Sequence, residues 1–455
     1  MGAQSPEEAA RTVFLKRIRI DNVRAIAGLE VDFNSEDGGA RKWTLLLGEN
    51  GTGKSTILRC IALLLCGRDA LPELLGRDPS SWIRSGRTNA RIEGTIATAQ
   101  GDDRVHLELH RDETISKTID RNAEPLAPLE DALAHTGRSY FLTGYGASRR
   151  LGRPGIPGDE QRSGRAARVR TLFDADAALR PLASWAMDLH YVRGESFLSL
   201  IRSALAELLP DARFKDIDKT RKTLVFDTAD GPVSLDDLSD GYQNVAAWVG
   251  DLLYRTTGTF DDYSNPLATR GLLLIDEIDL HLHVKWQRRL RRFIDNKLPN
   301  FQIVATTHSP MTAQQAGRGE VHVLARPTPA AAPEIRGYDT SPDRLALHQL
   351  IEPFFGIDTV DSARITGLKD EYRALKGKRR RSADENRRLE VLREQLADAP
   401  PAWNGGEGTK AQTEALRSIQ ALIENAAVRA SGTSDDKTPK TKPLRSQVGR
   451  KVVVK

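Results

Sequence analysis

Residues 48–55 read Gly48-Glu49-Asn50-Gly51-Thr52-Gly53-Lys54-Ser55, which is a complete G-x-x-x-x-G-K-S pattern. The apolar run 43–47 that precedes it has the composition of a buried strand, and the run 55–65 that follows has that of a buried helix. A glycine-rich loop between a strand and a helix is the setting in which this pattern binds phosphate. The segment therefore predicts a nucleotide-binding phosphate loop.

The residue types of this loop suit a nucleoside triphosphate. Glycines let successive backbone N–H groups converge on phosphate oxygens, and the helix that begins near Lys54 adds the positive end of its dipole. Lys54 supplies charge to the β and γ phosphates, and the Ser55 hydroxyl is a magnesium ligand. The loop residues predicted to bind nucleotide are Gly48, Asn50, Gly51, Gly53, Lys54, Ser55 and Thr56.

A second motif is the run Leu272-Leu273-Leu274-Ile275-Asp276-Glu277. Its apolar part is typical of a buried parallel strand. Such a strand would deliver Asp276 to the magnesium shell and place Glu277 where it can polarise an attacking water. Apolar strands often end in acids, so the pattern is specific only because it accompanies a phosphate loop.

Two further segments extend the predicted site. The apolar run 302–306 leads into His308, which is placed to sense the γ phosphate; a histidine satisfied within its own loop is the alternative. The segment Leu238-Ser239-Asp240-Gly241-Tyr242-Gln243 precedes an apolar helix. Taken alone, Ser239 at that position is explained as an ordinary helix N-cap.

Together these four motifs resemble the ABC-type ATPase heads of the RecF, SMC and OLD families over residues 13–355. The resemblance implies that Lys54, Ser55, Asp276, Glu277 and His308 act within one subunit. It also implies that Ser239 and Gly241 bind the γ phosphate held by a second subunit, so that two heads close around shared ATP. The run Asn22-Val23-Arg24 is similar to the family's N-terminal element, whose arginine lies near the nucleotide.

The spacing of the motifs and two differences from the ABC pattern indicate which subfamily the chain resembles. The 190 residues from Gly48 to Leu238 exceed the insert of transporter ATPases and are too few for SMC coiled-coil arms. His281-Leu282-His283 matches the His-Leu-His of OLD-like ATPases; a metal site at these histidines is the weaker interpretation because no third ligand is evident nearby. The expected Q-loop glutamine is missing from residues 144–150, and Asp240 replaces a signature glycine. Both departures resemble Septu (PtuA-like) defence ATPases.

The expected fold is an α/β P-loop NTPase head of ABC type, with a mixed sheet flanked by helices and an N-terminal antiparallel β element. It occupies residues 1–360, with a helical insert at about 165–210. A charged helical extension is predicted for 361–402, and a helix followed by a disordered basic tail for 403–455. Residues 361–455 hold 21 Lys and Arg against 13 Asp and Glu, so the basic charge belongs to this part of the chain.

Positive charge also crowds the predicted helix 285–294, whose stripe of Trp286, Leu290 and Phe293 is assigned to the core. Its arginines form either a solvated face or a DNA track. In the extension, the cluster around residues 376–381 contacts either a phosphate backbone or a partner protein; the sequence does not choose.

The predicted function is an ATP-hydrolysing, magnesium-dependent switch of a bacterial antiphage system. It is expected to form a homodimer or higher homo-oligomer and to control a separate nuclease or effector. No D-x-D pair follows His308, so no nuclease of its own is expected. The alternatives are a RecF-like DNA-binding repair ATPase and a nucleotide-gated scaffold with vestigial hydrolysis. No membrane span or signal pattern is evident, so a cytoplasmic location is expected.

Overall fold

The computed structural model describes residues 14–397, except 99–100, 134–140, 152–163, 181, 183–184, 188–198, 200–201, 203–204, 206–211, 219, 222, 261–264, 358 and 360. The chain divides into two compact units, Met1–Ile357 and Asp358–Lys455. The tail predicted for 403–455 lies outside the described residues.

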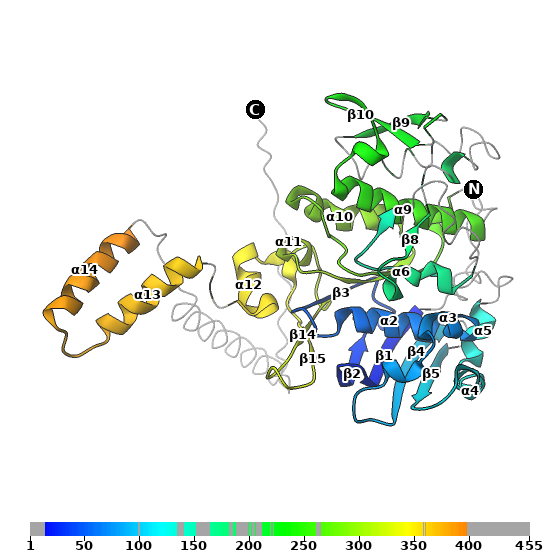
Figure 1. The fold of residues 1–455 in the computed structure, drawn as a ribbon, viewed down its shortest axis with the longest axis horizontal. Coiled ribbons are helices and arrows are strands. Elements are labelled where there is room, and N and C mark those ends of the chain that lie inside the picture. The colour runs from blue at the N-terminus through cyan, green and yellow to red at the C-terminus, as the bar shows by residue number, and fades with distance from the viewer. Residues whose placement is uncertain are drawn as a thin grey trace, which may run out of the picture. The chain divides into compact units, whose positions relative to one another are not determined.

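A six-stranded mixed sheet forms the centre of the first unit (Figure 1). Its order is β15-β14-β3-β13-β12-β6, and every neighbouring pair is parallel except β14 and β15. The bounds are β3 (Trp43–Gly48), β6 (Leu142–Tyr145), β12 (Gly271–Ile275), β13 (Phe301–Thr306), β14 (Val321–Ala325) and β15 (Glu334–Gly337). Since β3, β13 and β12 are adjacent and parallel, the loops after them meet at one sheet edge.

Both faces of this sheet are buried, which explains its continuous apolar strands. Side chains alternate between faces with period 2. In β12, Leu273 and Ile275 belong to one apolar core, whereas Leu272 and Leu274 belong to the other. In β3, Leu46 likewise faces the opposite side from its two leucine neighbours.

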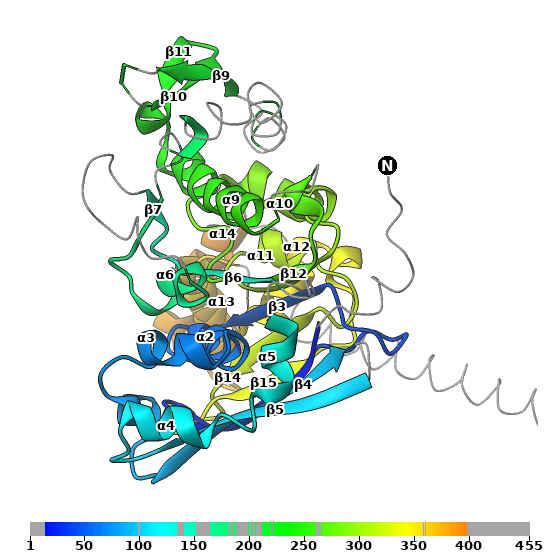
Figure 2. The ribbon, with the colours of Figure 1, turned by 90° about the vertical axis from the view of Figure 1, so that its right-hand side faces the viewer.

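A four-stranded antiparallel sheet covers one of these faces, with helix α2 (Lys54–Leu65) between the two sheets (Figure 2). Its order is β2-β1-β4-β5, and the predicted N-terminal hairpin is its β1–β2 pair. Nearly all of α2 is buried, as its run of Ile, Leu and Cys requires. The bounds are β1 (Phe14–Val23), β2 (Ile26–Asp32), β4 (Asn89–Thr98) and β5 (Gly101–His110).

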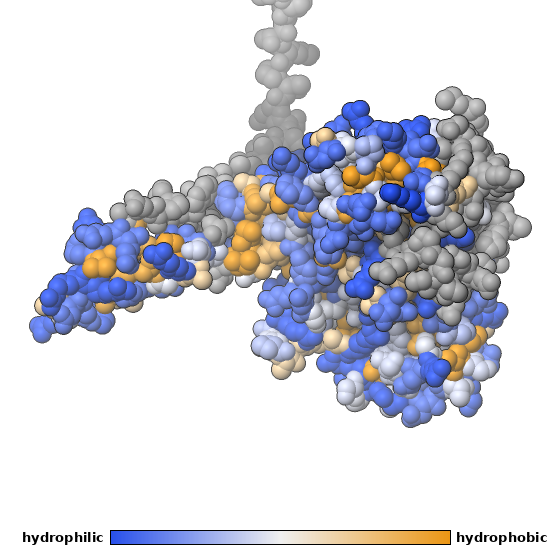
Figure 3. All heavy atoms as spheres, turned by 45° about the horizontal axis from the view of Figure 1, so that its top comes forward, coloured by the Kyte–Doolittle hydropathy of each residue, from blue (hydrophilic) through white to orange (hydrophobic). Residues whose placement is uncertain are grey.

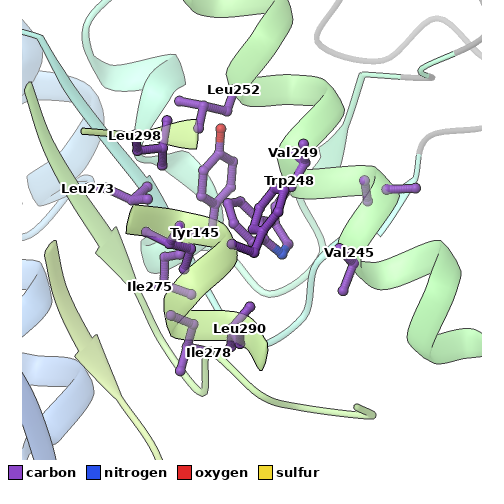
Figure 4. Packing of buried hydrophobic residues seen from close by; sticks show 14 of the residues in the cluster. Tyr145, Val245, Trp248, Val249, Leu252, Leu273, Ile275, Ile278, Leu290 and Leu298 are labelled. Atoms are coloured by element: carbon purple, nitrogen blue, oxygen red, sulfur yellow. The ribbon is translucent and has the colours of Figure 1, made fainter. Parts of the chain in front are cut away.

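Helices α9 (Asp240–Thr259) and α10 (Val284–Lys297) belong to the other core. Trp248 of α9 packs beside Tyr145 at the end of β6, with ring centroids 6.0 Å apart (Figure 4). The Tyr145 hydroxyl donates to Asp251 at 3.0 Å, and Asp251 pairs with Arg255 in the next turn of α9. Both bonds end on Oδ2 of the buried Asp251 carboxylate, so its charge is partly compensated.

The remaining elements are shorter or lie in the second unit. The strands are β7 (Arg150–Leu151), β8 (Ala178–Leu179), β9 (Arg213–Asp218), β10 (Thr223–Thr228) and β11 (Gly231–Ser234). The helices are α3 (Leu71–Leu75), α4 (Ile115–Arg121), α5 (Ala127–Leu133), α6 (Arg170–Phe173), α11 (Pro310–Ala313), α12 (Leu347–Phe355), α13 (Ala363–Lys376) and α14 (Ala383–Ala397).

Residues 115–121 form helix α4, whose N-cap Thr114 accepts the Lys117 N–H. The structure differs from the sequence expectation at one place in the first unit. Within 165–210, the expected helical insert, the described residues include the short helix α6 and also strand β8, which pairs with β7. Much of this range lies outside the described residues.

The second unit contains two helices within the predicted helical extension. Helices α13 and α14 pack on each other, and Arg388 forms a paired contact with Glu371 at 2.7 Å. Hydrophilic residues cover most of the pair, with some apolar side chains exposed among them (Figure 3). Within the part of the chain that the structure describes, every helix is too short or too polar to cross a lipid bilayer.

His322 on β14 gives the fold a predicted acid sensitivity. It is buried, its Nε2 accepts from Arg41 at 3.2 Å, and burial together with the Arg41 charge lowers its pKa to about 4. Asp32, the acidic group that acts on it, opposes this effect only partly. Below pH 6.5 the unfolded chain therefore binds a proton that the folded chain rejects. This difference lowers the free energy of unfolding progressively down to about pH 4, by about 3 kcal/mol.

We expect His322→Gln to remove this contribution while keeping an acceptor for Arg41. Urea unfolding at pH 7, 5.5 and 4.5 measures the effect. The variant should gain stability relative to the native chain as pH falls. An equal loss of stability in both proteins would contradict the prediction.

Candidate functional site

The phosphate loop follows β3 and requires glycine at its first position. Gly48 has φ +140°, and a Cβ there would lie 2.3 Å from the Leu324 carbonyl oxygen on β14. Neither the backbone angle nor the space admits another residue. Gly51 and Gly53 also have positive φ, at +77° and +101°, and Gly53 is the N-cap of α2. The loop thus has the local geometry that its motif predicts.

Lys54 is held over this loop. Its Nζ donates to the carbonyl oxygens of Gly48 at 2.7 Å and Glu49 at 2.9 Å, and the residue is only 7% exposed. Burial lowers its pKa, while the charges of Asp276 and Glu277 act in the opposite direction. The ammonium group therefore lies near the two acids that follow β12.

The acids are oriented by Thr306 at the end of the neighbouring strand β13. The Thr306 hydroxyl donates to Asp276 Oδ1 at 2.7 Å and accepts the Glu277 N–H, also at 2.7 Å. Glu277 has φ +47°, an uncommon backbone conformation for a residue with a side chain. One hydroxyl thus fixes a carboxylate and the turn that follows it.

The donor set fits a magnesium ion that also binds phosphates. Magnesium prefers oxygen ligands and usually takes one or two from protein, with waters and substrate phosphates filling the rest. Here Asp276 and Ser55 would be the protein ligands, and the Thr306 hydroxyl bonds Oδ1 of the Asp276 carboxylate. Within the described residues, no group of three or more His, Cys, Asp or Glu side chains could hold a metal alone.

His308 follows β13, and its exposed ring lies within the electrostatic field of Lys54, Glu277 and Asp276. Burial and the Lys54 charge lower its pKa, which favours the neutral form of the ring. A neutral imidazole can donate one N–H to a phosphate oxygen. The sequence-predicted residues Lys54, Asp276, Glu277 and His308 therefore come together in the structure.

The histidines of the His-Leu-His segment have local structural roles. His283 is the N-cap of α10, where its Nδ1 accepts the Lys285 N–H at 3.3 Å. His281 has φ +64° and turns its carbonyl toward α9. Neighbouring Asp279 is buried and accepts from Thr307 at 2.6 Å.

The predicted signature residues begin α9. Ser239 is its N-cap by position, yet its exposed side chain makes no capping hydrogen bond. Ordinary capping therefore does not account for the serine hydroxyl. Gly241 packs closely on the His281 carbonyl, since a Cβ there would lie 2.6 Å from that oxygen.

Arg24 lies in the β1–β2 turn, and the α2 residues that act on its charge are Arg59 and Cys60. It has φ +48°, and its guanidinium carbon is 3.9 Å from the centroid of the Trp82 ring. Burial and the nearby Arg59 charge lower its pKa. Ile26, two residues on, lies against Gly53 of the phosphate loop.

Two site residues were not found by sequence reasoning. Thr306 gives no pattern of its own. Arg149 lies in the segment 144–150, which replaces the expected Q-loop, and the missing glutamine was the only signal there. In the structure, Arg149 is buried against the backbone of Asp276 and Glu277.

Comparison with protein-family models gives two matches within the first unit. Residues 144–312 match the family described as "AAA domain, putative AbiEii toxin, Type IV TA system". Residues 17–130 match a family described as "AAA domain". The two segments contain the phosphate loop, the acids after β12, the signature segment and His308.

The similar curated proteins include a Septu protein PtuA of Bacillus mycoides, 28% identical over 311 residues, covering 68% of this chain and 40% of that protein. The "Retron Ec83 probable ATPase" of Escherichia coli is 26% identical over 202 residues, covering 44% and 36%. The "Retron Vc95 probable ATPase" of Vibrio cholerae is 36% identical over 92 residues, covering 20% and 18%. The chain thus spans less than half the length of these relatives.

Among solved structures, an SMC head bound to the C-terminal winged-helix domain of ScpA matches with a TM-score of 0.42 and 13% identity. It covers 72% of this chain and 98% of that one. The chain is thus similar to families of AAA domains, to Septu PtuA proteins and to retron probable ATPases.

Proposed function

We propose that the chain is an ATP-driven switch in which two copies close around shared magnesium ATP. The observation that carries this proposal is the division of the site. Lys54, Asp276, Glu277 and His308 lie together, whereas the exposed Ser239 hydroxyl makes no capping bond in its own chain. A γ phosphate supplied by a second copy would give this hydroxyl a partner.

In the proposed reaction, water attacks the γ phosphorus and the bond to the β-phosphate bridging oxygen breaks, which releases ADP. Glu277 accepts the proton of the attacking water. Lys54, the loop N–H groups and His308 would stabilise charge on the phosphate oxygens. Asp276 and Ser55 would hold a magnesium ion, which would supply further positive charge there. Asn50, Gly51, Thr56 and Arg24 complete the nucleotide contacts.

The proposed biological role is control of a separate nuclease or other effector in bacterial antiphage defence, in the cytoplasm. The names of the Septu and retron relatives support it. Direct DNA binding is a second candidate, favoured by exposed Lys285, Arg288, Arg289 and Arg292 on one side of α10. Turnover of the purified chain with and without double-stranded DNA separates the two.

A mixing experiment tests the shared site. Lys54→Ala and Ser239→Arg should each be inactive alone, since one lacks the phosphate-binding lysine and the other blocks the signature. If each site combines the phosphate loop of one copy with the signature of the other, a mixed dimer regains one intact site. Equal mixing should then restore about one quarter of native turnover, because about half of the dimers are mixed and each has one working site.

Phosphate release from the separate and mixed variants measures this effect. Native chain diluted with Lys54→Ala controls for simple subunit exchange. A mixture that stays as inactive as its components would contradict a shared site. Co-expression of both variants with the genes that flank this one should likewise restore phage resistance in cells.

A further inference from the structure

Arg149 is a buried arginine at the junction of three elements. It follows β6 and is only 3% exposed. Burial lowers its pKa to about 10, and the charges of Asp276, Asp279 and Glu277 oppose that effect. The guanidinium group is therefore still charged at pH 7, and its geometry has to compensate for lost hydration.

Each nitrogen of the guanidinium group has a partner. Nε donates to Asn244 Oδ1 on α9 at 3.1 Å. Nη1 donates to the Asp276 carbonyl oxygen at 2.9 Å, and Nη2 to the Glu277 carbonyl oxygen at 2.6 Å. This use of a rigid, planar fork is specific to arginine, because lysine offers a single point charge.

The two carbonyl contacts act on the turn that carries the predicted general base. Glu277 is in the left-handed region at φ +47°, which is strained for a residue with a side chain. Such a conformation persists only where its surroundings hold it. Arg149 bonds the Glu277 carbonyl oxygen and the Thr306 hydroxyl bonds the Glu277 N–H, while the Leu280 N–H also donates to that carbonyl at 3.0 Å. Arg149 and Thr306 are the two side chains among these groups.

The Asn244 contact connects this turn to the signature. Asn244 is buried one turn beyond Ser239 and Gly241 on the same helix. Gly241 independently packs on the His281 carbonyl, in the segment that follows Glu277. The start of α9 is therefore connected to residues 276–281 at two places. One connection runs through Arg149, and the other is the packing of Gly241 on His281.

We propose that Arg149 is a positioning residue that links the signature helix to Glu277. A partner's nucleotide that engages Ser239 and shifts the start of α9 would move Asn244, and through Arg149 it would set the Glu277 backbone. Each copy would then place its own general base only when its signature is occupied. This inference rests on the shared ATP site proposed above and adds the connection between its two halves.

Arg149→Lys tests the link, because it keeps the positive charge and loses the fork. We expect kcat to fall about 10²-fold, as for a small misplacement of a catalytic group. The Kd for ATP and ATP-dependent dimerisation should change by less than about threefold. Asn244→Ala, which leaves both carbonyl contacts in place, should lower kcat about tenfold with the same unchanged binding.

The double variant distinguishes coupling from independent damage. If Asn244 acts through Arg149, the double variant should be no slower than Arg149→Lys alone. Arg255→Lys is the matched control, since Arg255 is another arginine with little exposure, on α9 itself, and pairs with Asp251. It should lower the unfolding temperature but leave turnover near native.

Three outcomes would overturn the link: weakened ATP binding in proportion to kcat, multiplicative losses in the double variant, or an equal loss of turnover in Arg255→Lys. If Arg149→Lys does not fold, Asn244→Ala carries the same comparison. The proposed function is tested separately. It would be contradicted if mixing Lys54→Ala with Ser239→Arg did not restore turnover.

Discussion

Lys54→Ala should abolish nucleotide binding. In the structure, Lys54 is buried over the phosphate loop, with its ammonium group on the Gly48 and Glu49 carbonyl oxygens. Hydrogen bonds to charged groups contribute about 1.5–3 kcal/mol each. Loss of contacts to both the β and γ phosphates should therefore weaken magnesium ATP binding at least about 10²-fold.

Isothermal titration with magnesium ATP measures this change. Lys215→Ala is the control, because it removes an exposed lysine whose ion pair joins β9 and β10. Thermal unfolding should show both variants folded, since burial already lowers the pKa of Lys54 and its removal relieves that cost. If Lys54→Ala bound ATP with an affinity within about threefold of native, the phosphate-loop assignment would be wrong.

Glu277→Gln should stop turnover while leaving ATP bound. Glutamine has nearly the same shape, and its backbone N–H can still donate to the Thr306 hydroxyl. Its side-chain amide does not accept the proton of the attacking water. General-base removal costs about 10²–10⁴-fold in rate. Because hydrolysis is then slow relative to assembly, the variant should accumulate as an ATP-bound dimer.

Steady-state phosphate release and light scattering in magnesium ATP test both parts. Glu334→Gln, an exposed glutamate on β15, is the matched control and should behave as native. A loss of turnover below about tenfold would exclude Glu277 as the base. A monomeric ATP complex at micromolar concentration would argue against the shared site but not against the base.

The parts of the site that sequence reasoning could reach are those written as local patterns. The phosphate loop and the acids after Ile275 each occupy consecutive residues. For the phosphate loop, the flanking strand and helix patterns support the same prediction. Their convergence also follows from sequence, because parallel strands bring their carboxyl ends to one edge. The individual roles of these residues stay predictions until the variants are measured.

The contacts that hold these groups in place could not be reached in this way. Arg149 meets partners 95 to 128 residues away, and Thr306 meets Asp276 across 30 residues. Residues this far apart form no recognisable motif in a single sequence. Likewise, the close approach of Gly48 to Leu324 depends on the order of strands in the sheet, which local composition does not contain.

Helix α2 is enclosed between two sheets along most of its length. A segment packed on both sides has little freedom to shift without opening the protein interior. We therefore expect its first turn, with Lys54 and Ser55, to keep its position during the proposed ATP hydrolysis. In the proposed dimer, the element that moves would instead be α9 of the second copy. Its N-cap residue, Ser239, is exposed.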